Sequence, residues 1–417
     1  MRIGFFTDSY FPWVNGVSVS VKAFAEELEK LGHEVYIFCP GNARKNDAAE
    51  HSHIIRFRSF PSIWHEEFRD TIPFSTKNIE QAKSYNLDIV HVHTPAQMGI
   101  FGARIARETG VPLVTTYHTD IEQYAEVYRR ILLGFIAGAA FGPVAIGNVS
   151  MLRDTMLTLK PERPIRNWNK KIVREGLNVF HGNCDLVIAP SIKILKVLKS
   201  YKTPAPLVVL ATGVDPEEPK NATKSNMRDK LGIPKDAILL MITARLGQEK
   251  NIQTLIGAMG KMVTLEPRVH LLIAGIGPHQ DLFEQQADEL NVAQHITFAG
   301  LLSRPDIYAA LRDSDIFAFP SVMDTQGLVL NEAALMGLPL VYVDEEISPL
   351  TINKKTGLRA KNTVKSVADS IMTLIKQPEL RKRYGQAAHT AAMTLTMSKQ
   401  AKSLESQYQK LIDSSKK

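Results

Sequence analysis

The sequence contains little cysteine, and this scarcity narrows the class of protein. Cys39 and Cys184 are the only two in 417 residues, so no disulfide framework can form and a reducing compartment is favoured. Met1-Arg2 leads straight into a strand-like apolar run, and we therefore expect no signal peptide. Apolar residues make up 44% and charged residues 22%, values typical of a packed globular protein. These features predict a cytoplasmic protein long enough for two domains.

Strand-like and helix-like segments alternate along the chain, as in α/β domains with parallel sheets. A first series places strands at 2–8, 35–39, 54–57, 89–93, 111–116 and 185–190, with helices at 18–31 and near 98–108. A second series places strands at 207–210, 238–243, 269–274, 296–299, 316–320 and 340–343, with helices near 250–264, 278–290, 304–313 and 328–337. The sequence therefore predicts two doubly wound, Rossmann-like domains that face each other across a cleft.

The proline-containing stretch 203–206 is the best candidate for the linker between these domains. We place an N-terminal domain at 1–203, a C-terminal domain at 207–385, and a C-terminal helix at 386–417 that packs back on the N-terminal domain. The loop after the first strand does not contain G-x-G-x-x-G, and this absence disfavours a dinucleotide cofactor.

Positive charge is concentrated in one region of the first domain. Residues 129–202 contain 13 lysines and arginines against 4 acids, a local balance of +9, whereas the whole chain carries +7. Residues 131–152 carry no charge and approach the length of a membrane span. Pro143 and several glycines interrupt them, so we favour a shallow membrane-contacting helix or hairpin over a full span, with a buried core helix as the alternative. The basic residues would attract an anionic membrane surface.

Two carboxylates flank a glycine turn in the second domain. Asp324 and Glu332 are eight residues apart, too far for a pair on adjacent helical turns, and Gly327-Leu328 begins a helix-like run between them. Backbone N–H groups at such a helix start could bind a phosphate while the carboxylates accept hydrogen bonds from sugar hydroxyls. The alternative is one exposed acid on a loop and one on a helix.

Three further motifs follow predicted strands, where ligands bind in α/β domains. Asn15-Gly16-Val17 offers a close backbone approach at a helix start. His118 could hydrogen-bond a substrate hydroxyl or a developing charge. Arg245 and Lys250 supply a planar fork and a compact point charge, which suit a diphosphate. Taken singly, each also fits an ordinary loop, a structural histidine or a pair of surface cations.

Together and in this order, the motifs resemble those of retaining nucleotide-sugar glycosyltransferases of the GT-B architecture, glycosyltransferase family four. The resemblance covers nearly the whole chain, and it is carried by Asn15-Gly16-Val17, Tyr117-His118-Thr119, residues 211–215, the pair Arg245 and Lys250, and the two acids. The sequence is most similar to diacylglycerol glucosyltransferases and related lipid mannosyltransferases. It departs from the family at Asp324, where Glu is usual, and at Ala211-Thr212, where Pro-Asn is usual.

This resemblance implies how the donor diphosphate would be bound. Arg245 and Lys250 would hold the diphosphate and stabilise its charge as it leaves. Gly16, and the backbone at Gly327 and Leu328, would approach the same group. We assign no Asp-x-Asp pair of the kind typical of metal-dependent sugar transferases, so we expect no required metal and no cofactor, although a divalent metal is left open.

The resemblance also implies the partners of the remaining residues. Glu332 would bond the nucleotide ribose, Asp324 would contact hydroxyls of the donor sugar, and His118 would lie beside the sugar and the acceptor. The implied reaction transfers a hexose, glucose from UDP-glucose as the first choice and mannose from GDP-mannose as the second, to a membrane lipid such as 1,2-diacylglycerol. The enzyme would lie peripherally on the inner face of the cell membrane.

Three other functions are weighed against this one. A soluble glycosyltransferase with a sugar or small-molecule acceptor would bury residues 131–152 and need no lipid. A nucleic-acid-binding protein would use the basic region, but aromatic residues are not interleaved with its charges, so we expect no nucleic-acid partner. A non-catalytic sensor of nucleotide sugars would fit the shorter acid at Asp324.

Overall fold

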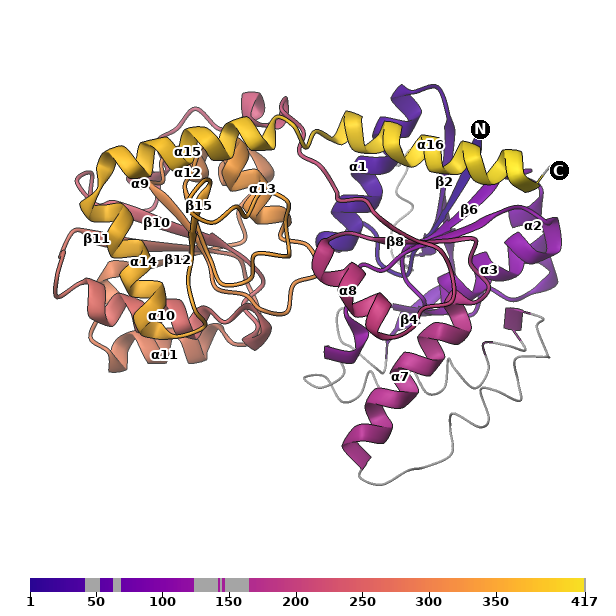
Figure 1. Ribbon diagram of the computed structural model, residues 1–417, viewed down its shortest axis with the longest axis horizontal. Coiled ribbons are helices and arrows are strands. Elements are labelled where there is room, and N and C mark those ends of the chain that lie inside the picture. The colour runs from indigo at the N-terminus through magenta and orange to yellow at the C-terminus, as the bar shows by residue number, and fades with distance from the viewer. Residues whose placement is uncertain (42–52, 63–68, 124–141, 143–144, 147–164, 416–417) are drawn as a thin grey trace. The chain divides into compact units, whose positions relative to one another are not determined.

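The structure is a computed structural model of the chain, and it describes residues 1–41, 53–62, 69–123, 142, 145–146 and 165–415. The chain forms two compact units, coloured along the sequence in Figure 1. The first unit combines residues 1–212 with residues 397–417, and the second contains residues 213–396. Each is built on its own parallel sheet.

The sheet of the first unit has seven strands in the order β3-β2-β1-β6-β7-β8-β9, and all its pairs are parallel. Its strands are β1 (Arg2–Phe6), β2 (Glu34–Pro40), β3 (Ile54–Phe57), β6 (Ile89–Val92), β7 (Leu113–Thr116), β8 (Leu186–Ala189) and β9 (Leu207–Val209). A separate antiparallel pair is formed by β4 (Ser59–Pro61) and β5 (Arg69–Thr71).

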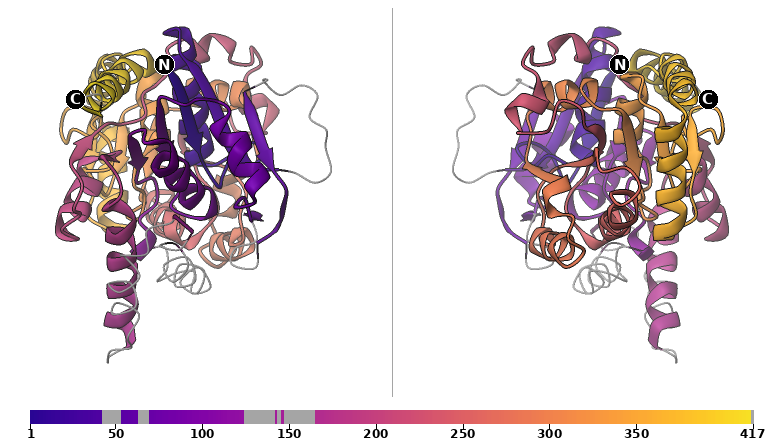
Figure 2. Two further views of the ribbon diagram at one scale, coloured as in Figure 1. Left: turned by 90° about the vertical axis from the view of Figure 1, so that its right-hand side faces the viewer. Right: turned by 90° about the vertical axis from the view of Figure 1, so that its left-hand side faces the viewer.

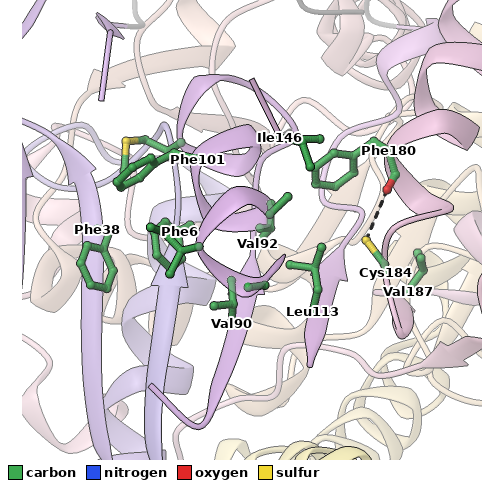
Figure 3. Packing of buried hydrophobic residues seen from close by; sticks show 14 of the residues in the cluster. Phe6, Phe38, Val90, Val92, Phe101, Leu113, Ile146, Phe180, Cys184 and Val187 are labelled. Atoms are coloured by element: carbon green, nitrogen blue, oxygen red, sulfur yellow. Dashed lines mark hydrogen bonds between the residues drawn. The ribbon is translucent and has the colours of Figure 1, made fainter. Parts of the chain in front are cut away.

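Helices cover both faces of this sheet because successive strand residues point to opposite sides. Ile3 and Phe5 of β1 pack with α1 (Gly16–Lys30) and α16 (Met397–Ser415) in one core cluster. α16 lies beside α1 and close to the N-terminus (Figure 2). Phe6 points to the other face, where it packs with Phe38, Val92 and Phe101 (Figure 3). The helices on that face are α2 (Thr76–Lys83), α3 (Gln97–Thr109), α7 (Ile165–His181) and α8 (Ile192–Ser200).

The second unit has a six-stranded parallel sheet in the order β12-β11-β10-β13-β14-β15. Its strands are β10 (Ile238–Thr243), β11 (Val269–Ala274), β12 (Ile296–Gly300), β13 (Ile316–Phe319), β14 (Leu340–Tyr342) and β15 (Gly357–Arg359). Its helices are α9 (Met227–Lys230), α10 (Ile252–Met262), α11 (Gln280–Glu289), α12 (Arg304–Arg312), α13 (Leu328–Leu335), α14 (Val364–Lys376) and α15 (Pro378–Ala392), with short 3₁₀ turns η2 (Glu218–Asn221), η3 (Gln248–Lys250) and η4 (Ala293–His295).

The structure corrects the assignment of residues 207–210, which we predicted to start the second domain. β9 is the edge strand of the first sheet, where it pairs with β8, and Val187 N donates to the Pro206 carbonyl at 2.9 Å. The prolines at 204 and 206 end the preceding turn but leave the chain extended, so it continues along the same sheet. The first unit therefore reaches Thr212.

The second boundary also differs from the predicted break at residue 386. α15 continues to Ala392 within the second unit, because Ala388 and Ala392 are buried and His389 Nδ1 lies 2.6 Å from the Leu335 carbonyl oxygen. The chain returns to the first unit only with α16, whose Tyr408 is fully buried there.

Most of the uncharged stretch 131–152 lies outside the described residues. Within it, Ile146 is described, and this side chain is 4% exposed and packs in the core cluster of Figure 3. Among the residues that the structure describes, none of the helices has the length and apolar character needed to cross a membrane.

Candidate functional site

The sheet order of the second unit creates a position where ligands bind in this class of fold. The chain leaves β10 toward β11 and β12 on one side, whereas β13, β14 and β15 continue on the other. Ligands of such sheets bind beyond the carboxyl ends of the two strands that flank this reversal. Arg245 follows β10 and Asp324 follows β13, so both predicted residues come from the two strands concerned.

The two predicted cations of this unit each lie against a carboxylate. Lys250 Nζ is 2.5 Å from Asp324 Oδ1, and their side chains are 21% and 16% exposed. Arg245 Nη1 is 3.2 Å from an oxygen of Glu249, a residue that sequence reasoning did not select. The site thus pairs its positive and negative charges, and both cations keep part of their surface accessible.

Hydrogen bonds from two side chains to backbone carbonyls join the Lys250 segment to the end of β13. Asn251 adopts a left-handed conformation with φ of 55°, and its Nδ2 donates to the Pro320 carbonyl at 2.9 Å. Ser321 Oγ donates to the Glu249 carbonyl at 3.2 Å. These bonds hold the two strand ends together, which explains how residues 74 positions apart, Lys250 and Asp324, meet.

A glycine turn supports the Arg245 loop from the neighbouring strand. Gly275 has φ of +141°, and a Cβ there would overlap the Ala244 carbonyl oxygen. A Cβ on Gly277 would come within 2.5 Å of Leu246 N. Leu246 N donates to the Ile276 carbonyl at 3.0 Å, so the two backbones run in direct contact on both sides of Arg245. Only glycine allows this approach.

The glycine turn before α13 is more fully bonded than the sequence suggests. Gly327 precedes α13, and its N–H donates to the Ile347 carbonyl at 3.1 Å. Leu328 N donates to the Gln326 carbonyl at the same distance. A phosphate bound by these two N–H groups would have to replace both bonds. No side chain caps the N-terminus of α13, which favours an anion at this helix end.

Glu332 belongs to a charged cluster that the sequence did not predict. Arg304 Nη1 donates to Glu332 Oε1 at 2.6 Å, and Arg304 Nη2 donates to Glu218 Oε2 at 2.5 Å. Tyr308 Oη donates to the same oxygen of Glu218 at 2.5 Å. Burial raises the pKa of Glu332, and Arg304 opposes this effect. Burial disfavours the charge of Arg304, but Glu332, Tyr308 and Glu218 outweigh it and raise the pKa of the guanidinium.

In the sheet of the first unit, the strand order reverses between β1 and β6. The predicted residues of this unit follow β1 and β7, the strand next to β6. Gly16 is exposed at the first position of α1. Asn15 caps this helix, since its Oδ1 accepts from Val17 N and Ser18 N at 3.0 Å each. His118 follows β7 and is half-buried.

Three histidines form a row in the first unit. His93 Nδ1 lies 3.0 Å from His118 Nε2, and the His91 and His93 rings are tilted by 30° with centroids 4.1 Å apart. Burial lowers the pKa of His118 to about 4, and it lowers the pKa of His91 and of His93 well below the usual value. All three imidazoles are therefore neutral at pH 7. His91 and His93 were predictable candidates, because positions i and i+2 of a strand share a face.

Asp313-Ser314-Asp315 has the Asp-x-Asp spacing, although we did not predict it to bind a metal. It precedes β13 and so lies at the opposite end of this strand from Asp324. Asp313 Oδ2 accepts from Met227 N at 2.7 Å, and Asp315 Oδ2 accepts from Leu239 N at 2.9 Å, which are structural roles. In the described part of the chain, no three His, Cys, Asp or Glu residues are grouped as a metal would require.

Comparisons with known proteins cover both units. Residues 14–218 match the model of Glycosyltransferase Family 4, and residues 223–391 match that of Glycosyl transferases group 1. The chain is 32% identical to the alpha-monoglucosyldiacylglycerol synthase of Streptococcus pneumoniae over 82% of this chain and 70% of that protein. It is 26% identical to the alpha-monoglucosyldiacylglycerol synthase of Acholeplasma laidlawii over 100% and 99% of the two chains.

Solved structures share the fold. The sucrose-phosphate synthase from Thermosynechococcus elongatus aligns with a TM-score of 0.74 at 19% identity, over 99% of each chain. The Anabaena protein HepE in complex with UDP-glucose aligns with a TM-score of 0.72 at 18% identity, over 98% of this chain and 100% of that one. Both predictions of class, the two Rossmann-like domains of GT-B and the enzyme family, are thus confirmed: the chain belongs to glycosyltransferase family 4 and is a hexosyltransferase with the GT-B fold.

Proposed function

We propose that this protein transfers glucose from UDP-glucose to 1,2-diacylglycerol with retention of the anomeric configuration. The observation that carries the proposal is the similarity of both units to two alpha-monoglucosyldiacylglycerol synthases. The charged residues beyond β10 and β13 agree with it, because a nucleoside diphosphate leaving group requires fixed positive charge.

The diphosphate would be bound by the second unit. Arg245 and Lys250 are part-exposed cations in the segment that follows β10, and each would exchange a carboxylate partner for phosphate oxygens. The N-terminus of α13 would add backbone N–H groups and its dipole at Gly327 and Leu328. Gly16, at the N-terminus of α1, would contribute a further close backbone approach.

The sugar and ribose would be bound by hydroxyl-accepting groups. Asp324 would accept from hydroxyls of the donor hexose once Lys250 turns to the phosphate, and Glu332 would accept from the ribose. His118 is neutral at pH 7 because burial lowers its pKa to about 4. It would therefore act beside the sugar and acceptor as a hydrogen-bonding group and not as a cation.

Two charges develop during the reaction, a positive one on the sugar and a negative one on the departing diphosphate. The bond between the anomeric carbon and the phosphate oxygen breaks while the sugar becomes oxocarbenium-like, and the acceptor oxygen forms the new bond on the same face. The proton of the acceptor hydroxyl passes to the departing phosphate oxygen. Arg245 and Lys250 would stabilise the negative charge that develops on the diphosphate.

The acceptor would be reached at an anionic membrane surface on the cytoplasmic side. In the described residues, α8 presents Lys199 to solvent, and Lys202 follows it, also exposed. Ile192 at the start of the same helix is 48% exposed. Each basic residue near an anionic surface contributes about 1 kcal/mol of attraction. The double variant K199Q/K202Q should bind anionic vesicles more weakly in co-sedimentation, and equal partition of the wild type to neutral and anionic vesicles at all salt concentrations would contradict this role.

The reaction is tested by a transfer assay read by mass spectrometry. UDP-glucose and GDP-mannose are each paired with diacylglycerol in vesicles, with phosphatidylinositol, and with water-soluble sugars. We expect a hexosyl-diacylglycerol product from UDP-glucose. Product formed only on a water-soluble acceptor would overturn the lipid acceptor.

The second candidate donor is GDP-mannose. The GDP-mannose-dependent alpha-mannosyltransferase of Mycolicibacterium smegmatis is 24% identical over 82% of this chain and 80% of that protein. The same assay decides between the donors, because a hexosyl lipid formed only from GDP-mannose would make the protein a lipid mannosyltransferase.

A further inference from the structure

The cluster around Arg304 links three elements of the second unit at the carboxyl side of its sheet. Arg304 is the first residue of α12, which follows β12, and Glu332 lies in α13, which follows β13. Glu218 lies in η2. One guanidinium therefore joins two carboxylates that come from segments 86 and 28 residues away in the sequence.

The geometry of the cluster uses the fork of arginine. Nη1 serves Glu332 at 2.6 Å and Nη2 serves Glu218 at 2.5 Å, so each carboxylate has its own nitrogen. Tyr308, one helical turn after Arg304, supports the same arrangement: its hydroxyl lies 3.2 Å from Nη2, and the guanidinium carbon lies 5.2 Å from its ring centroid. Lysine carries a single point charge and cannot reproduce these two directed contacts.

Glu332 is bonded on one side only. Its Oε1 accepts from Arg304, its side chain is 12% exposed, and its Oε2 accepts no hydrogen bond from any residue that the structure describes. A carboxylate oxygen that is oriented through its neighbour and still accessible is suited to accept from ligand hydroxyls.

We propose that Arg304 is a positioning residue of the donor site, which fixes the Glu332 carboxylate through Oε1 and leaves Oε2 for the hydroxyls of the nucleotide ribose. This inference rests on the proposed function, because it takes the ribose as the ligand of Glu332. Glu218 and Tyr308 in turn bind Arg304, and these contacts hold its guanidinium in place beside Glu332.

The cluster also determines the charge of Glu332. Burial raises the pKa of this carboxyl, Arg304 lowers it, and Glu218 raises it further. Tyr308 is the other titratable group that faces it, and this phenol stays protonated because its own pKa is raised, chiefly by burial. Without Arg304, burial and Glu218 act unopposed, so Glu332 stays protonated to higher pH and accepts hydrogen bonds less well.

The test is the substitution R304Q, read as donor KM against pH and as UDP binding by isothermal titration calorimetry. We expect a KM for the donor raised about tenfold or more at pH 7 and a KM that falls as the pH rises from 6 to 9, while the wild-type KM stays flat. The kcat at saturating donor should change much less. R304K keeps the charge, so its KM should be raised but nearly independent of pH.

Two control variants distinguish the role of Arg304 from the role of Glu332 in the proposed function. R268Q removes an arginine of the same unit that pairs with Glu266 at 2.9 Å at the other end of the sheet, and it should leave KM unchanged. E332Q should raise KM with no dependence on pH, and R304Q/E332Q should be no worse than E332Q alone.

The outcomes are distinct. If E332Q binds UDP like the wild type, the ribose role in the proposed function is wrong. If E332Q weakens binding but R304Q shows wild-type KM and pH profile, Arg304 has no positioning role. Should R304Q fail to fold, R304K decides, because a wild-type KM in that variant would also refute the inference.

Discussion

His93 Nδ1 and His118 Nε2 are 3.0 Å apart, and their rings stack with centroids 5.3 Å apart at an angle of 25°. One nitrogen of the pair must donate and the other accept, because burial lowers the pKa of both residues and leaves them neutral. His93 is 1% exposed, and its Nε2 has no hydrogen-bond partner among the described residues. The pair therefore couples the tautomers of the two rings, because the nitrogen that carries the proton on one ring requires an unprotonated nitrogen on the other.

We expect His93→Phe to lower kcat about tenfold, because His118 would lose the bond that orients its ring. His93→Asn keeps a polar group near the position of Nδ1 and should retain more activity. The measurement is kcat at saturating donor and acceptor, with His118→Ala for comparison. A His93→Phe enzyme with wild-type kcat would show that the pair is only structural.

Lys250→Met should lower kcat about 100-fold or more, because the departing diphosphate would lose one of two fixed cations. Removing this cation also leaves Asp324 without its 2.5 Å partner, so folding must be verified by circular dichroism. Lys261→Met, on the exposed side of α10, is the matched control and should keep full activity. Equal kcat values for the two variants would remove Lys250 from the diphosphate site.

Gly275→Ala should destabilise the second unit by about 2 kcal/mol or more, since the new Cβ would overlap the Ala244 carbonyl and the backbone has positive φ. Gly232→Ala also introduces a side chain at positive φ, but nothing lies within 4 Å of its Cβ. This control should cost about 1 kcal/mol. Urea unfolding followed by circular dichroism compares the two, and similar losses would contradict the close-approach argument.

His181 should make the first unit less stable in acid. Burial lowers its pKa to about 4, below the unfolded value of about 6.5, so the unfolded state binds more protons between these values. The contribution is complete above pH 6.5 and is lost as the pH falls toward 4, by about 1.4 kcal/mol per pH unit. His181→Leu should flatten the pH dependence of the unfolding free energy by this amount.

Tryptophan fluorescence isolates this effect, because the three tryptophans of the sequence, at positions 13, 64 and 168, all fall within the sequence range of the first unit. His270→Leu is the matched control. His270 also has a pKa lowered to about 4, mainly by burial, but it lies in the second unit. It should leave the tryptophan-detected transition unchanged at every pH, and an unaltered slope in His181→Leu would refute the assignment.

The order and type of most elements were predictable from the sequence because buried parallel strands are short apolar runs with clear stops. The segments 238–243 and 269–274 coincide with β10 and β11. β9 was assigned to the wrong sheet because a three-residue strand carries no information about its partner. β9 pairs with β8 because the residues before it already lie beside β8, and the side chains of residues 207–209 do not specify this partner.

The parts of the candidate site that depend on strand order could be predicted from the sequence, whereas the contacts that depend on how helices pack could not. Lys250 and Asp324 meet because their strands are neighbours at the reversal of the sheet, and strand order could be expected from the βαβ pattern. The contact of Arg304 with Glu218 spans 86 residues and needs both α12 and η2 in place. No local pattern marks either residue.

The return of α16 to the first unit affects how the chain folds during synthesis. Residues 213–396 form one continuous segment, so the second unit can fold as soon as that segment leaves the ribosome. The first unit must wait, because Leu404 and Tyr408 complete the apolar layer over Ile3 and Phe5. An apolar sheet face at the N-terminus thus stays uncovered until residues 397–415 have been synthesised, and chaperones that bind exposed apolar surface would find their longest opportunity there.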